Sequence, residues 1–161
     1  MNDGRHILVV DDNSTNVDLI LAALRRHKFS FEVVVANDGD EALDYLYRRG
    51  KFLGRNGGAP AVVLLDLKMP RVDGFEVLRQ VKGSAELKMI PIVVFSSSGG
   101  DQDRLKSYQL GANAYVVKPV DFNKFVETVR EIRDFWLECN ELPMNGANGS
   151  DAAVPQLTLT S

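Results

Sequence analysis

Five polar side chains that could carry out chemistry each follow directly on a short apolar run. Three are carboxylates, one is a hydroxyl and one is an amine: Asp11, Asp12, Asp66, Ser96 and Lys118. Three carboxylates held together repel one another, and one or more of them is driven toward protonation. A hard divalent cation relieves that repulsion, because Mg²⁺ prefers oxygen ligands. The set therefore predicts a carboxylate nucleophile beside a metal ion, with the lysine ammonium and the serine hydroxyl close by. These are the groups that phosphoryl transfer requires.

The elements between these residues must bring them together. Apolar runs rich in branched residues predict buried strands at residues 7–10, 31–35, 61–65, 91–95 and 114–117. Between and after them, apolar residues recur at helical spacing, as Val17, Ile20 and Leu24 do, and predict five helices. Strands that alternate with helices indicate a parallel sheet with helices on both faces.

Right-handed crossovers leave few topologies for such a sheet, and the flavodoxin-like order 2-1-3-4-5 fits best. The predicted fold class is thus α/β, a flavodoxin-like (βα)5 three-layer sandwich. In that order strands 1, 3, 4 and 5 are neighbours, and their carboxyl ends lie where open sheets bind ligands. We expect the five polar side chains to converge there, with the Lys118 ammonium paired to Asp66.

Composition bounds the class of protein. The 161 residues are 45% apolar and 25% charged, as in a soluble globular domain. A net charge of −3 and a pI near 5.4 argue against non-specific nucleic-acid binding. The single Cys139 cannot form an internal disulfide, the first six residues lack a signal peptide, and no apolar run reaches membrane-spanning length. We therefore expect a cytoplasmic protein that binds neither nucleic acid nor membrane.

We predict one domain over residues 5–140 and a flexible tail over residues 141–161. The tail beyond Pro143 is rich in small and polar residues. The alternation of Leu and Thr at residues 157–160 would suit a strand added to a partner's sheet, but we favour a loose tail. A glycine-rich stretch at residues 48–60 predicts a surface loop.

The chemical residues also resemble those of a known family, the response-regulator receiver domain of two-component signalling, over roughly residues 5–138. The motifs that carry the resemblance are Asp11-Asp12, Asp66 followed by Met69-Pro70 and Asp73-Gly74, then Ser96, and Lys118-Pro119. The resemblance implies that Asp66 is the phosphoacceptor for a histidine kinase. It implies Mg²⁺, with Mn²⁺ as the alternative, held by Asp12, Asp66 and the backbone carbonyl of Lys68, with Asp11 acting through water.

The resemblance further implies a conformational switch. Ser96 and Lys118 would grip the phosphoryl oxygens, and Tyr115 would swing inward into the space that Ser96 leaves. The surface formed by the fourth helix, fifth strand and fifth helix would change shape, as a biased two-state equilibrium. The bond before Pro119 would be cis, as is common in this family.

A finer resemblance concerns the subfamily. The long loop at residues 48–60 and the segment Asp134-Phe135-Trp136-Leu137 are similar to single-domain regulators partnered with bacterial and cyanobacterial phytochromes. This likeness implies a phytochrome as the sensor kinase. Phe135, Trp136 and Leu137 put apolar bulk on more than one side of the last helix, which favours an interface, either a homodimer, which we expect, or a kinase-docking surface.

Several residues have plainer explanations beside the functional ones. Tyr115 could simply pack in the core, while Lys68 and Ser98 could be solvated surface. We hypothesise instead that the Lys68 ammonium shields an acyl phosphate from water. Cys139 is interpreted as an inert thiol, and both histidines, His6 and His27, as surface residues.

Competing functions can be weighed against the same residues. A phosphohydrolase with an aspartyl nucleophile would carry Asp-x-Asp, but Lys68 stands at the second position. A flavin-binding electron carrier would need a Ser/Thr-rich phosphate loop after the first strand, where Asp11 and Asp12 stand. A receiver-like module that never takes phosphate would not need every reactive position filled. We therefore expect a phosphoacceptor that catalyses only its own phosphorylation and dephosphorylation.

Overall fold

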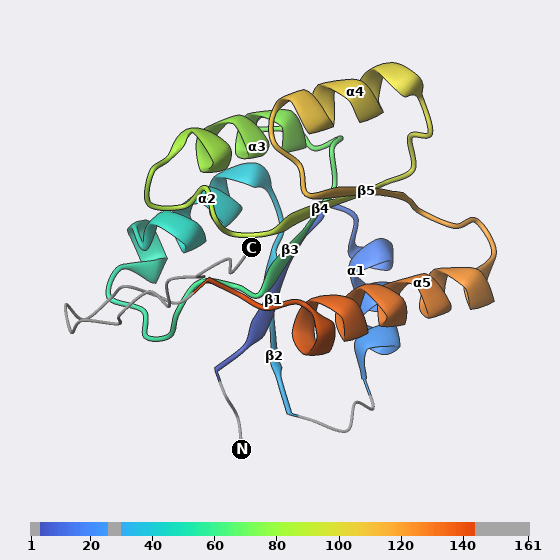
Figure 1. Ribbon diagram of the computed structural model, residues 1–161, viewed down its shortest axis with the longest axis horizontal. Coiled ribbons are helices and arrows are strands. Elements are labelled where there is room, and N and C mark those ends of the chain that lie inside the picture. Colours follow the sequence, from blue (N-terminus) through green and yellow to red (C-terminus); the bar gives the residue numbers. More distant parts are fainter. Residues whose placement is uncertain (1–3, 26–29, 144–161) are drawn as a thin grey trace, which may run out of the picture.

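The computed structural model describes residues 4–25 and 30–143. Five strands alternate with five helices along this part of the chain (Figure 1). The elements are β1 (His6–Val10), α1 (Ser14–Leu24), β2 (Glu32–Ala36), α2 (Gly39–Tyr47), β3 (Val62–Leu65), α3 (Gly74–Gly83), β4 (Ile92–Ser96), α4 (Asp101–Gln109), β5 (Ala114–Val117) and α5 (Phe122–Asp134). A 3₁₀ turn, η1 (Gly50–Phe52), lies between α2 and β3, and a π-helical turn, η2 (Phe135–Cys139), follows α5.

The strands form one parallel sheet in the order β2-β1-β3-β4-β5, so the predicted topology is confirmed. Helices α2, α3 and α4 cover one face of the sheet, and α1 and α5 cover the other (Figure 1). Because side chains alternate along a strand, successive residues of β1 enter different cores. Leu8 and Val10 pack in the core beneath α2 and α3, whereas Ile7 and Val9 pack in the core beneath α1 and α5.

Four of the helices begin with the same side-chain cap. The cap residues Asn13, Asp38, Asp73 and Asp121 each accept a hydrogen bond from the backbone N–H three residues later. Such a cap contributes about 1 kcal/mol. Three of these helices, α1, α2 and α5, begin within a few residues of the ends of β1, β2 and β5, so their caps also fix where the chain turns beside the strand ends.

His6 is not the surface residue that the sequence suggested. It is the first residue of β1, 4% exposed, and its Nε2 lies 2.9 Å from the Tyr45 hydroxyl. β1 is an interior strand of the sheet, and α2 covers its first residue through the Tyr45 ring. Burial lowers the pKa of His6, which keeps the ring neutral and able to accept from Tyr45. His27 lies outside the described residues.

The C-terminal apolar segment is also arranged differently from the prediction. The π-helical turn that follows α5 buries Leu137, whose backbone carbonyl accepts a hydrogen bond from Arg5. Phe135 is half-exposed, and Trp136 is partly buried against the core beneath α1 and α5. Leu137 is therefore a core residue and not an interface residue, because the wider turn directs it inward. Residues 144–161, including the Leu/Thr alternation, lie outside the described residues.

Within the described ranges, none of the helices has the length and apolar character needed to cross a membrane.

Candidate functional site

The predicted convergence at the carboxyl ends of the strands is confirmed for the carboxylates and the lysine. Asp66 follows β3, and its amide donates to the Val10 carbonyl at the end of β1 (3.0 Å). The Lys118 amide, after β5, donates to the carbonyl of Ser96 at the end of β4 (2.7 Å). Backbone pairing thus fixes residues distant in sequence at one edge of the sheet.

Three carboxylates form the centre of this edge. One oxygen from each of Asp11, Asp12 and Asp66 lies within 4.8 Å of the other two. Asp11 is buried, Asp66 is partly buried and Asp12 is exposed, so the cluster opens toward solvent at Asp12. Burial raises the pKa of Asp66; Asp11 and Asp12 raise it further, and Lys118 opposes them. An oxygen cluster whose charges repel in this way fits a hard divalent cation.

Lys118 forms the predicted ion pair with Asp66 and also a shorter one with Asp11 that was not predicted. Its Nζ donates to Asp11 Oδ2 at 2.8 Å and lies 3.7 Å from Asp66 Oδ1, beyond hydrogen-bonding distance. The amine and the Asp11 carboxylate are both buried, and a buried charge needs a bonded partner. The more buried carboxylate therefore takes the hydrogen bond, while Asp66 interacts with the same amine only through its charge.

Asp11 has both oxygens engaged. Oδ2 accepts from Lys118, and Oδ1 accepts from the backbone N–H of Asn13 at 2.9 Å. These bonds orient the carboxylate and occupy part of its capacity to accept. Asp12 and Asp66 consequently have more oxygen lone pairs to offer to a cation than Asp11 has.

Gly74 shapes the turn that follows the central carboxylate. Its amide donates to the Leu67 carbonyl at 2.9 Å. A Cβ at this position would lie 2.7 Å from Leu67 Cα and still closer to the Asp66 carbonyl oxygen. Only glycine allows this close approach. Met69 of the same turn is buried, whereas Lys68 is exposed.

A second support of this turn was missed from the sequence. Arg71, with φ near 65°, donates through Nη2 to Asp38 Oδ2 at 3.0 Å, at the start of α2. A Cβ on Gly39 would lie 2.7 Å from the Val72 Cγ1. The turn between β3 and α3 is thus held against α2. The only sign of this contact in the sequence is the Asp38-Gly39 dipeptide, whose aspartate also caps α2.

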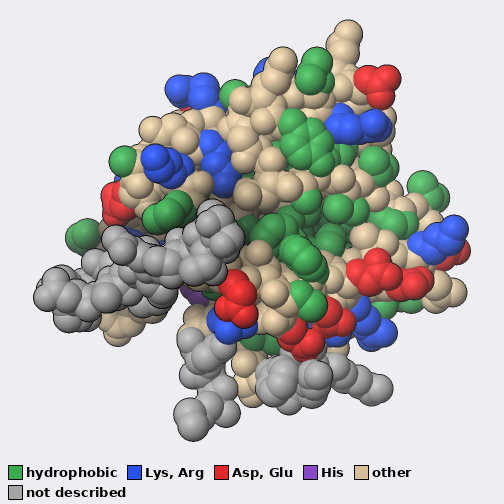
Figure 2. Space-filling view, viewed as in Figure 1, with side chains coloured by type: hydrophobic (Ala, Val, Ile, Leu, Met, Phe, Trp, Pro, Cys, Tyr) green, Lys and Arg blue, Asp and Glu red, His purple; other side chains and the backbone are tan. Residues whose placement is uncertain are grey.

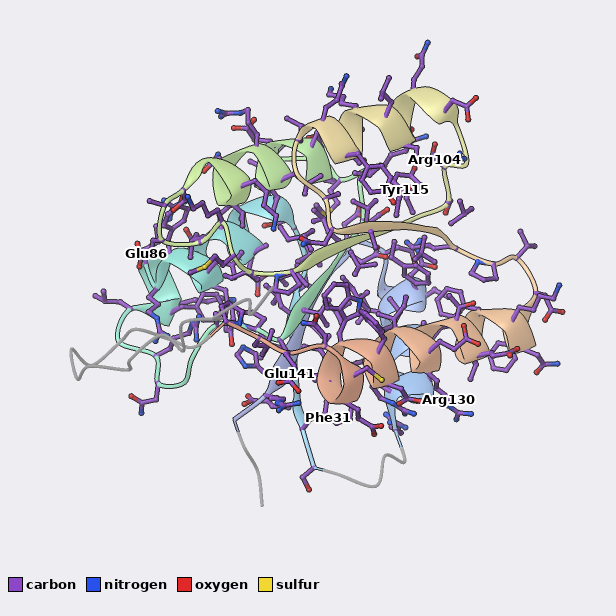
Figure 3. All side chains as sticks on the ribbon, viewed as in Figure 1. Phe31, Glu86, Arg104, Tyr115, Arg130 and Glu141 are labelled. Carbon is purple, nitrogen blue, oxygen red and sulfur yellow. The ribbon has the colours of Figure 1, made fainter. Side chains whose placement is uncertain are left out.

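Ser98 connects the remaining predicted residues. The Ser98 amide donates to the buried Ser96 Oγ at 3.1 Å, and the Ser98 carbonyl accepts from the Tyr115 hydroxyl at 2.8 Å. Ser98 Oγ donates to Asp103 Oδ2 at 2.6 Å. Tyr115 is partly buried and points from β5 toward the start of α4, near Arg104 (Figure 3). Ser98 is therefore structurally bonded and not simply solvated surface.

The bond before Pro119 was expected to be cis, and that prediction is wrong. No peptide bond among the described residues is cis, so the Lys118–Pro119 bond is trans. The trans form is the more stable one for a bond before proline by about 0.5–1 kcal/mol, so a cis bond needs surrounding contacts that favour it.

The sequence matches the family model of the response regulator receiver domain over residues 7–130. Among curated relatives, the probable methanogenesis regulatory protein FilR2 of Methanothrix harundinacea is 42% identical over 139 residues, covering 85% of this chain and 86% of the relative. Response regulator Rcp1 of Synechocystis is 34% identical over 142 residues, covering 88% of this chain and 95% of Rcp1.

Solved structures show the same likeness. The phosphorylated cyanobacterial phytochrome response regulator RcpA is 37% identical with a TM-score of 0.82, over 87% of this chain and 99% of that one. The Mn²⁺-bound form of Rcp1 gives 34% identity and a TM-score of 0.80 over the same shares. The bacteriophytochrome response regulator AtBRR is 53% identical with a TM-score of 0.68, over 85% of this chain and 98% of that one.

Proposed function

Because this chain belongs to the response-regulator receiver family, we propose that it accepts a phosphoryl group from a histidine kinase on Asp66 and signals through a conformational change. The observation that carries the proposal is the cluster of Asp11, Asp12 and Asp66 with Lys118 beside it at the carboxyl edge of the sheet. A partly buried carboxylate flanked by two other acids and one amine is suited to charge neutralisation followed by esterification.

Mg²⁺ is the proposed cofactor, and Mn²⁺ can take its place. Asp12, Asp66 and the Lys68 backbone carbonyl would hold the ion, and Asp11, with both oxygens already bonded, would contribute through water. When bound, the ion supplies positive charge that lets an anionic phosphoryl group approach the carboxylates. The Mn²⁺-bound structure of the relative Rcp1 supports a divalent cation in this family.

The transfer needs one bond formed and one broken. An Asp66 carboxylate oxygen forms the new P–O bond as the P–N bond to the kinase histidine breaks, and the departing imidazole nitrogen takes up a proton. The Lys118 ammonium, already near Asp66, would bind one phosphoryl oxygen. The Ser96 hydroxyl, at the end of the adjacent strand, would donate to another.

The output surface is proposed to be the face formed by α4, β5 and α5. Hydrophobic side chains gather between α4 and α5 on this side of the molecule (Figure 2). Those that are well exposed include Leu105, Tyr108, Val117, Val120 and Phe122. Solvent-exposed apolar groups gain free energy when a partner covers them. We propose that a second copy of this chain covers the face, which makes the protein a homodimer.

The sensor kinase is proposed to be a bacterial phytochrome. The support is the likeness to two regulators whose names connect them to phytochromes: RcpA, at 37% identity, and AtBRR, at 53% identity. The 42% identity to FilR2 shows that a regulator of a different process shares the same receiver, so the kinase assignment needs its own test.

The central experiment is incubation with Mg²⁺ and a small phosphodonor, followed by intact-mass measurement and sizing. We expect one phosphoryl group on the wild-type chain and none on Asp66→Asn. Asp18→Asn, which removes an exposed carboxylate from α1, is the matched control and should be phosphorylated normally. A label on Asp66→Asn, or none on the wild type, would refute the proposal. Phosphotransfer from a purified phytochrome kinase tests the partner separately.

A further inference from the structure

The loop between β4 and α4 is organised by a single residue, Ser98. Its amide donates to Ser96 Oγ, its carbonyl accepts from the Tyr115 hydroxyl, and its own hydroxyl donates to Asp103 Oδ2 at 2.6 Å. The Ser98 hydroxyl also accepts from the Gly100 amide at 3.4 Å. Ser98 therefore bonds to Ser96 and Tyr115 through its main chain and to α4 through its side chain.

Asp103 is a well-anchored partner for that hydroxyl. It lies in the first turn of α4, where the positive end of the helix dipole favours a carboxylate. Its carbonyl accepts from the buried Ser107 hydroxyl at 2.7 Å. The cap residue of α4, Gly100, has no side chain that could cap the helix. The hydrogen bond from Ser98 to Asp103 instead connects a side chain of the loop to the first turn of α4. Arg104, close to Tyr115 in Figure 3, adds a bond to the Gly99 carbonyl.

The direction of the bond to Ser96 matters for phosphoryl binding. A serine hydroxyl has one donor hydrogen and two acceptor sites. Because the Ser98 amide uses an acceptor site of Ser96 Oγ, the Ser96 hydrogen can still donate to a phosphoryl oxygen. The loop thus orients the Ser96 hydroxyl without consuming the hydrogen that the proposed function requires.

We propose that the Ser98 hydroxyl and the Asp103 carboxylate form a latch that holds the β4–α4 loop in the arrangement that orients Ser96 for a phosphoryl oxygen and anchors Tyr115. Ser98 and Asp103 act as positioning residues, and the inference rests on the proposed function of Ser96. The latch lowers the cost of binding, since the loop is ordered before the phosphoryl group arrives.

The test is titration of the full chain with beryllofluoride in saturating Mg²⁺, followed by NMR, on Ser98→Ala, Asp103→Ala and the double variant. Each single variant should bind beryllofluoride about fivefold more weakly, the equilibrium change that one net hydrogen bond is worth. The double variant should be no weaker than either single one, because both changes break the same bond. Ser98→Thr, which keeps the hydroxyl, should restore wild-type affinity.

Two controls separate the latch from a general structural effect. Mg²⁺ affinity without beryllofluoride should stay unchanged in all variants, because the latch does not touch the carboxylate cluster. Asp101→Ala, at an exposed position in the same helical turn, should bind beryllofluoride as the wild type does. Unchanged or tighter binding by Ser98→Ala overturns the latch while the proposed function stands. Failure of the wild type itself to bind beryllofluoride overturns the proposed function, and the latch with it.

Discussion

Individual residues set the electrostatic character of this site. Asp66 shares its surroundings with two other carboxylates and one buried amine, and that amine is hydrogen-bonded to Asp11. Pairing with Asp11 relieves the most buried of the three charges. Burial, with the charges of Asp11 and Asp12, keeps the pKa of Asp66 raised although Lys118 lowers it, and an added positive charge would lower it further.

The raised pKa predicts how stability depends on pH. The folded chain holds the Asp66 proton more tightly than the unfolded chain does, so the free energy of unfolding falls as pH rises from about 3.8 through the folded-state pKa. Asp66→Asn should therefore be more stable than the wild type at pH 7.5 with a chelator present. The difference should shrink as the pH approaches 3.8. Urea unfolding at several pH values measures it, and equal stability at pH 7.5 would contradict the expectation.

Lys68 gives a second prediction at this scale. The side chain is exposed and lies two residues after Asp66, and we hypothesise that it shields an acyl phosphate on Asp66 from attacking water. Lys68→Ala should release phosphate from the phosphorylated chain severalfold faster, because a barrier to attacking water is gone. Lys88→Ala, which removes an exposed lysine from the α3–β4 connection, is the matched control. An unchanged decay rate for Lys68→Ala would end the idea.

At the scale of the elements, periodicity predicted most of the fold and local contacts decided the rest. Each predicted strand is present within one residue of its bounds, because runs of branched apolar residues have few alternatives to a buried sheet. His6 was misjudged because the bond that satisfies it comes from Tyr45, on another element. Leu137 was misjudged because a π-helical turn breaks the 3.6-residue period on which the prediction relied.

The same reasoning explains what was found and missed in the site. Asp11, Asp66 and Lys118 could be predicted to converge, because sheet topology alone sets where strands end. The shorter bond of Lys118, to Asp11, could not be predicted, because it depends on which carboxylate is more buried. The hydrogen bonds from Arg71 to Asp38 and from Ser98 to Asp103 join loops to helices. Hydrophobic periodicity in the sequence carries no information on such contacts.

A substitution of Gly74 tests how closely the start of α3 packs against the turn that follows β3. Gly74→Ala places a methyl group against the Asp66 carbonyl and Leu67 Cα, so the turn or the start of α3 must shift. We expect a loss of about 1–3 kcal/mol in the free energy of unfolding, the usual cost of overpacking. Gly83→Ala is the matched control in the same helix: a Cβ there has no neighbour within 4 Å, and alanine favours a helix. If both variants lose stability equally, close packing at Gly74 is not the cause.

At the scale of the whole molecule, the carboxylate cluster and the exposed apolar face lie on different parts of the fold. The carboxylates lie at the carboxyl edge, while the exposed apolar side chains lie on α4, β5 and the start of α5. Tyr115 of β5 joins the two, since its hydroxyl is bonded to the loop that also holds Ser96. A movement of Ser96 would therefore reach the α4–β5–α5 face through only two hydrogen bonds, those of Ser98 with Ser96 and with Tyr115.

The proposed homodimer follows from this arrangement and can be tested directly. Leu105 on α4 is 60% exposed, so Leu105→Lys should leave folding intact while placing a charge in the interface. We expect this variant to be phosphorylated normally yet to elute as a monomer under conditions in which the wild type is dimeric. Leu53→Lys, at an 80% exposed position outside this face, is the matched control and should remain dimeric. A dimeric Leu105→Lys would place the interface elsewhere.

The two glycines that pinch the turn after β3 also limit how this pocket can be redesigned. Gly39 and Gly74 each lie so close to that turn that even one methyl group collides with it. Lys68 on the same turn has an exposed side chain, whereas Arg71 is bonded to Asp38 and has a positive φ. A library intended to retune the lifetime of a phosphoryl group on Asp66 should vary Lys68 and leave Arg71 and both glycines untouched.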